Sequence, residues 1–341
     1  RLAITVPRGS CSAVHRCICS RAPKASSANS AHGTANVEAP ALWSQNALTE
    51  RLDLKWPILQ APMGSITTPQ LAGAVSDAGG LGALGMWGFD ANEARRRIEG
   101  FRQLSSGGLN VNYPLWPDPG ELGTVASAMR TRLQALYDQQ GLGRVPAPSA
   151  VAGAVSAAHL QTLLGSKPEV VSFHFGLPER AIVDALRDAG VFVISSATTV
   201  HEALQLEASG VNAVIAQGVE AGGHRGTFTD VDVGMQPGLF ALLPQVVDAV
   251  SLPVIAAGAI GDGRGVAAAM MLGASAVQVG TAFLRTKEAN VSAGHRAGLA
   301  NAADANTVVT DVVSGRPARY VRNTLINALT GTAPLPFPAQ M

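Results

Sequence analysis

Short apolar runs alternate with longer amphipathic stretches along most of the chain, beginning at Trp56. Eight of the apolar runs have the length and composition of strands, and several are continuous, as in strands buried on both faces of a parallel sheet. They lie at residues 57–61, 81–85, 109–113, 170–176, 191–197, 213–218, 253–259 and 276–283. The pattern therefore predicts repeated strand–helix units.

Helix-forming stretches separate most of these strands, at residues 69–78, 92–104, 179–188, 200–209, 239–250 and 263–272. Their ends carry residues that stabilise helix termini. Thr68 precedes a proline at the first helical position, and Thr199 begins a Thr-x-x-Glu sequence that resembles a capping box. Glycines stand where four of the helices should end, at positions 79, 190, 210 and 273.

This alternation predicts an α/β fold, and eight such units close naturally into a (β/α)8 TIM barrel. A doubly wound open sheet is the alternative. Two segments exceed what a minimal barrel needs, at about 114–168 and from 285 to about 316. Both leave the barrel at the C-terminal ends of strands, where barrel enzymes keep their sites. We expect them to form a smaller subdomain that covers the substrate, within a barrel domain of residues 39–341.

Residues 1–38 differ from the rest of the chain, because they are rich in Ser, Ala and Arg and contain no acidic residue before Glu38. We expect a disordered tail or a non-native leader, with an organelle-targeting segment as the alternative. All three cysteines lie here, at positions 11, 17 and 19. The predicted barrel therefore has neither a disulfide framework nor a cysteine nucleophile, and we expect no metal site.

The bulk composition narrows the class of protein. The formal net charge is +1, so the total gives no sign of a nucleic-acid partner. Only 14% of the residues are charged and the mean hydropathy is +0.20, which suits a large buried core. No apolar run reaches the roughly 18 residues that a membrane-spanning helix needs. We expect a soluble cytoplasmic protein that could form a homodimer.

The strongest chemical signal is the segment AQGVEAGGHRG at residues 216–226, directly after the sixth predicted strand. Its glycines let backbone approach a flat or anionic ligand without a clash from a Cβ atom. His224 in such a loop is placed to act as an acid or a base near neutral pH. The other reading is a flexible surface turn. His174 lies inside the fourth strand and could face either the core or the barrel mouth, whereas His201 reads as structural.

Two further strand ends carry glycines. Gly258 ends the seventh strand, and Gly280 is followed by Thr281 in the eighth. The loops after these strands of a barrel commonly bind phosphate through backbone N–H groups, and a threonine hydroxyl can donate another hydrogen bond. At the end of the first strand, the run Ala61-Pro62-Met63 offers a stiff apolar ledge without a titratable group, which suits packing against a planar ring.

Together these segments resemble the nitronate monooxygenase family, formerly called 2-nitropropane dioxygenases. The resemblance rests on residues 57–63, Asn112, and residues 171–176, 197–199, 220–226, 256–258, 280–284 and 314–319, in that order along the chain. It implies FMN held without a covalent link. It also implies oxidation of alkyl nitronates, including propionate 3-nitronate, by O2 to a carbonyl compound and nitrite, with the redox work carried by the flavin.

The resemblance also assigns residues. Ala61, Pro62 and Met63 would lie along the isoalloxazine, Asn112 and Gln217 would hydrogen-bond to the flavin, and Gly222, Gly223, Gly258, Gly280 and Thr281 would surround the phosphate. His224 matches the active-site histidine of the family. It would take the α-proton of a neutral nitroalkane or, when protonated, bind the nitronate oxygens. The substrate is less well defined, because the chain has only three tyrosines for pockets that often use Tyr and Lys.

Two other functions remain open on the sequence. An FMN-dependent enoyl-acyl-carrier-protein reductase that uses NAD(P)H shares the barrel and a similar loop around the histidine. A flavin-binding module without catalytic activity is the second alternative.

Overall fold

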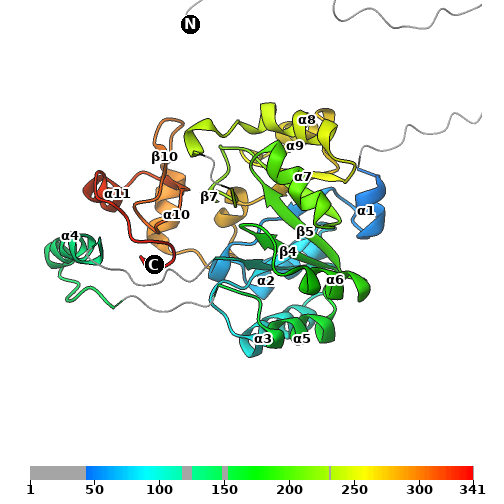
Figure 1. Ribbon diagram of the computed structural model, residues 1–341, viewed down its shortest axis with the longest axis horizontal. Coiled ribbons are helices and arrows are strands. Elements are labelled where there is room, and N and C mark those ends of the chain that lie inside the picture. The colour runs from blue at the N-terminus through cyan, green and yellow to red at the C-terminus, as the bar shows by residue number, and fades with distance from the viewer. Residues whose placement is uncertain (1–43, 117–124, 148–152, 230–231, 341) are drawn as a thin grey trace, which may run out of the picture. The chain divides into compact units, whose positions relative to one another are not determined.

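Eight parallel strands form the central sheet in the order β1-β9-β8-β6-β5-β4-β3-β2 (Figure 1). They are β1 Ile58–Gln60, β2 Gly82–Gly85, β3 Leu109–Pro114, β4 Val170–His174, β5 Phe192–Ala197, β6 Ala213–Gln217, β8 Val254–Ala257 and β9 Ala276–Val279. A parallel bridge between Leu59 and Leu81 joins the first and last strands of this order. The Gln60 amide adds hydrogen bonds to the backbone N–H and C=O of Ala83 across the same seam. The predicted barrel is confirmed.

This computed structural model describes residues 44–116, 125–147, 153–229 and 232–340. The predicted tail at 1–38 lies outside the described residues. Among the described residues, no helix has the length and apolar character needed to cross a bilayer, and no group of three or more His, Cys, Asp or Glu side chains is arranged to hold a metal ion.

Helices follow the strands as the sequence predicts. They are α2 Pro69–Asp77, α3 Ala91–Arg102, α6 Arg180–Asp188, α7 Val200–Ala208, α8 Leu239–Ala249 and α9 Gly263–Met271. Thr68 and Thr199 cap α2 and α7 through their side chains, and the glycines at 79, 190, 210 and 273 all have positive φ. The Glu202 carboxylate does not return a hydrogen bond to the backbone N–H of Thr199, as a full capping box requires. It accepts instead from Thr198 and Thr227.

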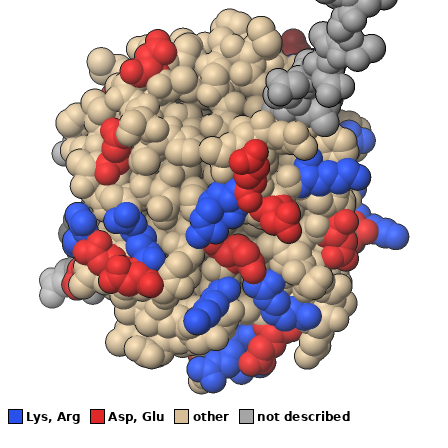
Figure 2. All heavy atoms as spheres, turned by 90° about the vertical axis from the view of Figure 1, so that its right-hand side faces the viewer, with Lys and Arg blue, Asp and Glu red and all other residues tan. Residues whose placement is uncertain are grey.

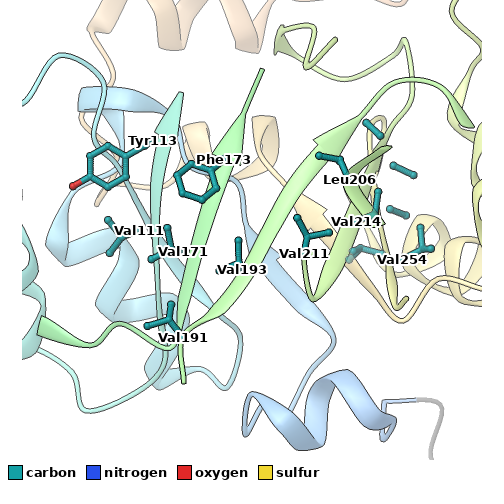
Figure 3. Close-up of a cluster of buried hydrophobic side chains, with 14 of the residues drawn as sticks. Val111, Tyr113, Val171, Phe173, Val191, Val193, Leu206, Val211, Val214 and Val254 are labelled. Carbon is teal, nitrogen blue, oxygen red and sulfur yellow. The ribbon is translucent and has the colours of Figure 1, made fainter. Parts of the chain in front are cut away.

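Alternate residues of each strand face opposite sides, and the two sides differ in chemistry. Val111, Val171 and Val193 belong to the large apolar cluster that also contains residues of the surrounding helices (Figure 3). Tyr113 lies in this cluster too, with its ring 5.3 Å from that of His159. The other face lines the barrel interior. There, a second apolar cluster includes Leu48 and Leu52 from α1 (Ala47–Arg51) and its C-cap.

The interior becomes polar toward the C-terminal ends of the strands. The inward alternation on neighbouring strands reaches Asn112, Ser172, His174, Ser196 and Gln217, of which all but His174 are buried. Burying polar groups is costly unless they find partners or serve a ligand. The polarity gradient therefore marks the C-terminal end of the barrel as the end that carries chemistry.

Segments outside the barrel pack together. The strands β10 (Thr307–Thr310), β11 (Ala318–Val321) and β7 (Gly223–His224) form a small antiparallel sheet. Met129 of α4 (Val125–Gln140) shares an apolar cluster with α11 (Thr324–Leu329) and residues 335 and 339. In contrast, α5 (Ala157–Ser166) packs on the barrel helices α3 and α6. Of the segment at about 114–168, α4 thus packs with the C-terminal segment and α5 with the barrel helices. That either segment covers a substrate stays a prediction. A further α-helix, α10, spans Ala293–Ala300.

In Figure 2, basic and acidic side chains are mixed over the middle and lower part of the face, and the few charged groups in the upper part are acidic. On the described part of this face, basic side chains are thus interspersed with acidic ones.

Candidate active site

His224 stands at the C-terminal side of the barrel, seven residues after β6 ends. Gly223 has a φ of 76°, a conformation that favours glycine, and this turn brings the chain into the short strand β7. There, His224 and Gly223 pair with Ala318 and Arg319 of β11. The histidine is thus held between the barrel and the C-terminal segment rather than on a free surface turn.

Aromatic rings surround the His224 imidazole. Trp87 stacks on it with ring centroids 5.6 Å apart, while Phe175 and Phe337 meet it edge-on at 6.0 and 5.4 Å. Trp116 lies 4.6 Å from Trp87. Trp87, Trp116 and Phe175 follow β2, β3 and β4 closely, whereas Phe337 comes from the far C-terminal segment. The site around His224 is therefore apolar on several sides.

One hydroxyl fixes the protonation pattern of the ring. The Ser314 hydroxyl donates to the carbonyl oxygen of Arg316 at 3.1 Å, and it lies 2.9 Å from His224 Nε2. Since a hydroxyl has one proton and a carbonyl can only accept, Ser314 Oγ accepts a hydrogen bond from His224 Nε2–H. The neutral ring therefore carries its lone pair on Nδ1, for which the described part of the chain provides no hydrogen-bond partner.

The electrostatic setting keeps His224 neutral. Burial, with the positive charge of Arg316 as the second cause, lowers the pKa of His224 from 6.5 to about 4. At neutral pH the imidazole can thus accept a proton but does not provide a positive charge. Of the two roles expected for His224, the geometry and charge favour the proton acceptor.

His174 supports the His224 loop from beneath. Its Nε2 lies 3.3 Å from the carbonyl oxygen of His224, and its Nδ1 lies 2.6 Å from Ser196 Oγ. The carbonyl requires Nε2 to be the donor, so Nδ1 accepts from the serine hydroxyl. Burial, with the nearby His224 as the second cause, lowers the pKa of His174 to about 3. His174 therefore faces the barrel mouth as a neutral support, which decides between the two placements that its sequence allows.

Gln217 also fastens this loop. Its Nε2 donates to the carbonyl oxygen of His224 at 3.1 Å, and its Oε1 accepts from the N–H of Gly226 at 2.8 Å. Asn112, the other amide expected to contact the flavin, donates through Nδ2 to the carbonyl oxygen and hydroxyl of Ser172. In this structure both amides thus orient the site, and a flavin contact for either remains a prediction.

Glu202 is a site residue that the sequence interpretation missed. It is fully buried on α7, and its carboxylate accepts from the backbone N–H and hydroxyl of Thr198. It also accepts from the hydroxyls of Thr227 and Thr229 and from two backbone N–H groups of residues 228 and 229. These bonds outweigh burial and hold the pKa of Glu202 below its usual value. The loop after His224 is thereby attached to α7.

The glycines and the ledge predicted for the cofactor converge from four strand ends, those of β1, β6, β8 and β9. A Cβ atom on Gly280 would lie 3.2 Å from Ala61 Cβ and 3.8 Å from Met63 Sδ, and one on Gly222 would lie 2.7 Å from Thr281 Oγ1. Gly258 has a φ of 131°, and a Cβ atom there would lie 3.3 Å from the backbone nitrogen of Ala221. Pro62, the middle residue of the ledge, is partly buried. The structure therefore brings the apolar ledge, Gly280 and Thr281 together beside the loop that carries Gly222 and His224.

Arg316 and Phe337 are the other site residues that the sequence interpretation missed, and both belong to the C-terminal segment. The Arg316 guanidinium lies 3.9 Å from the centroid of the Phe175 ring, which is an attractive cation–π contact. Burial lowers the pKa of Arg316 to about 10, so it stays positively charged at neutral pH. The sequence does place Arg316 in one of the segments that carry the resemblance, but that gives the residue no role.

Comparison with known proteins identifies the family. A family model described as nitronate monooxygenase matches residues 45–341. The chain belongs to the nitronate monooxygenase family. A probable nitronate monooxygenase of Staphylococcus aureus is 37% identical over 294 residues, which cover 85% of this chain and 81% of that protein.

Two solved structures agree with the family in fold. Nitroalkane oxidase from Streptomyces ansochromogenes superposes with a TM-score of 0.79 at 40% identity, covering 86% of this chain and 84% of that one. FabK from Thermotoga maritima gives a TM-score of 0.65 at 31% identity, covering 82% and 75%. This nitronate monooxygenase family member is thus an oxidoreductase of the flavin-dependent class that oxidises nitronates or nitroalkanes.

Proposed function

We propose that this chain binds FMN without a covalent link and uses O2 to oxidise alkyl nitronates to a carbonyl compound and nitrite. The observation that supports this most directly is the convergence of Gly222, Gly280 and Thr281 beside the ledge at Ala61 and Met63. These residues come from three separate strand ends, and His224 follows Gly222 by two residues in the same loop. Small residues at such a point allow a phosphate and a flat ring to approach backbone closely.

The residues present fit a flavin mononucleotide. A Cβ at Gly222 would point at the Thr281 hydroxyl. The space between the loops after β6 and β9 is therefore open only because residue 222 is a glycine and has no side chain. On β9, Gln278 Oε1 is buried and has no hydrogen-bond partner in the described part of the chain. Such an orphaned acceptor suits the N–H donor of a bound ring. When bound, FMN supplies the electron acceptor for the nitronate and passes electrons on to O2.

The protein's own residues would then prepare the substrate. His224 Nδ1 accepts the α-proton of a neutral nitroalkane, because its lone pair is free and its lowered pKa keeps it unprotonated. Ser314 orients the ring, while His174 and Gln217 hold the backbone of His224 in place. Trp87, Phe175 and Phe337 exclude water from the reacting atoms.

Purification and spectroscopy test the cofactor assignment. We expect a yellow protein that releases FMN, and not FAD, when it is denatured by heat, as identified by chromatography of the supernatant. Release of FMN without breaking a bond would also show that the link is not covalent. A colourless protein that takes up no FMN on reconstitution would contradict the assignment.

The lowered pKa of His224 predicts an unusual pH dependence for neutral nitroalkanes. A base works unprotonated, so kcat/KM should stay level above about pH 5 and fall only as the pH drops through the pKa of about 4. With the ordinary histidine pKa of 6.5, the fall would begin near neutrality. Initial rates with freshly diluted 2-nitropropane between pH 4 and 7 measure the profile. A midpoint near 6.5 would show that His224 is not buried as described.

A further inference from the structure

Arg316 occupies a constrained turn between β10 and β11. The preceding Gly315 has a φ of 82°, and a Cβ atom there would collide with the backbone at Leu335 and Phe337. The turn therefore packs closely against residues 335–337, the same C-terminal segment that supplies Phe337 to the site. The guanidinium lies 3.9 Å from the centroid of Phe175 and 5.9 Å from that of Phe337.

The charge of Arg316 is not balanced by an ion pair with any described residue. Its Nη2 donates to the carbonyl oxygen of Thr227, and its Nε is buried without a partner. Glu202 is the carboxylate whose charge acts on it. However, both oxygens of Glu202 already accept hydrogen bonds from residues 198 and 227–229. A partly buried cation with unused donors is costly unless an anion completes it.

Neighbouring arginines do not share this property. Arg225 donates through all three guanidinium nitrogens, to Gln236 and to the carbonyl oxygens of Gly218 and Gln217. Arg319 likewise uses all three, on the carbonyl oxygen of Val219 and the hydroxyl of Thr307. These two arginines hold the loop after β6. Only Arg316, among the three, keeps donors in reserve.

Arg316 and His224 are neighbours at the same two aromatic rings. Both contact the rings of Phe175 and Phe337, and the Ser314 hydroxyl accepts from His224 Nε2 and donates to the Arg316 carbonyl oxygen. A proton acceptor and a cation thus meet at one pair of aromatic rings, close enough for the charge of Arg316 to act on His224. Oxidation of a nitroalkane can use both groups. The base removes the proton of the α-carbon, and the cation stabilises the negative charge that this places on the two oxygens of the nitro group.

We propose that Arg316 binds the oxygen atoms of the nitro or nitronate group, an inference that rests on the proposed function. For a neutral nitroalkane, the α C–H bond breaks and its proton moves to His224 Nδ1. The electron pair forms the C=N bond of the nitronate, and one N–O oxygen takes the negative charge beside Arg316. For a nitronate that is already an anion, the same guanidinium attracts and orients it. A planar guanidinium suits a two-oxygen anion better than an ammonium group does.

Three variants test this role: Arg316→Met, Arg316→Lys and, as a matched control, Arg322→Met, which changes an exposed arginine of the same segment. The substrate is propyl-2-nitronate, followed by O2 uptake, and the binding probe is nitrate, followed by calorimetry on the purified protein with its flavin. We expect Arg316→Met to raise KM for the nitronate about 10- to 100-fold and to abolish nitrate binding, since a hydrogen bond to a charged group is lost. Flavin content should not change.

The other variants sharpen the result. Arg316→Lys keeps the charge without the planar fork, so KM should rise about three- to tenfold. Arg322→Met should stay within about twofold of the wild type. Wild-type KM and nitrate affinity in either Arg316 variant would overturn the role of Arg316 alone. Absence of nitronate-dependent O2 uptake by the wild-type protein would instead overturn the proposed function.

Discussion

His224→Asn should lower kcat/KM for neutral 2-nitropropane by about 10²- to 10⁴-fold, the usual contribution of a positioned general base. Asparagine cannot accept the α-proton, although it can keep a hydrogen bond to Ser314. With preformed propyl-2-nitronate no proton has to be removed, so the loss should be below about tenfold. Paired initial-rate measurements of O2 uptake with the two forms of the same compound give the comparison.

The matched control for this experiment is His201→Asn. His201 is exposed on α7 and bonds only to Gln205, so the same substitution there should leave both rates unchanged. If His224→Asn reduced the oxidation of the nitroalkane and the nitronate equally, the histidine would be needed for something other than proton removal. Thermal unfolding of both variants would show whether such an equal loss comes from misfolding.

Gly222→Val should weaken FMN binding by about 30- to 150-fold. A Cβ at this position would lie 2.7 Å from Thr281 Oγ1, and the valine methyl groups would occupy the space proposed for the phosphate. Loss of a charged hydrogen bond or two costs roughly 2–3 kcal/mol, which corresponds to this range. Fluorescence titration of the flavin-free protein with FMN measures the dissociation constant.

Gly261→Val is the control for the steric argument. Gly261 follows β8 on the same side of the barrel, and a Cβ there would meet no atom within 4 Å. Neither glycine has a positive φ, so backbone strain does not distinguish the two substitutions. FMN affinity should therefore be nearly unchanged in Gly261→Val. Equal affinities in the two variants would place the phosphate elsewhere.

The barrel was predictable because its signals are local. Each strand reads as a short apolar run, and the glycines at 79, 190, 210 and 273 mark helix ends by a backbone conformation that needs no distant partner. The parallel pairing of β6 with β8, and the seam between β1 and β2, follow once eight such units are counted. The open sheet considered as an alternative is excluded by the bridge between Leu59 and Leu81.

The candidate site was only partly predictable, because much of it depends on contacts between distant segments. His224 stands out in a glycine-rich loop, but Phe337 lies more than 100 residues further along the chain and carries no motif. Glu202 reads as part of a helix cap, whereas its carboxylate holds residues 227–229. The sequence suggests a flavin contact for Gln217, which stays a prediction, but it does not show that the Gln217 amide spans the backbone of His224 and Gly226. Only the folded chain reveals these contacts.

The most direct test of the proposed function is a paired assay on one purified sample. We predict O2 uptake with propyl-2-nitronate accompanied by equimolar nitrite, and no nitronate-dependent consumption of NAD(P)H. The same sample should fail to oxidise NAD(P)H when it is given an enoyl thioester. NAD(P)H oxidation with the enoyl thioester, without O2 uptake or nitrite release from the nitronate, would contradict the account and favour an enoyl reductase.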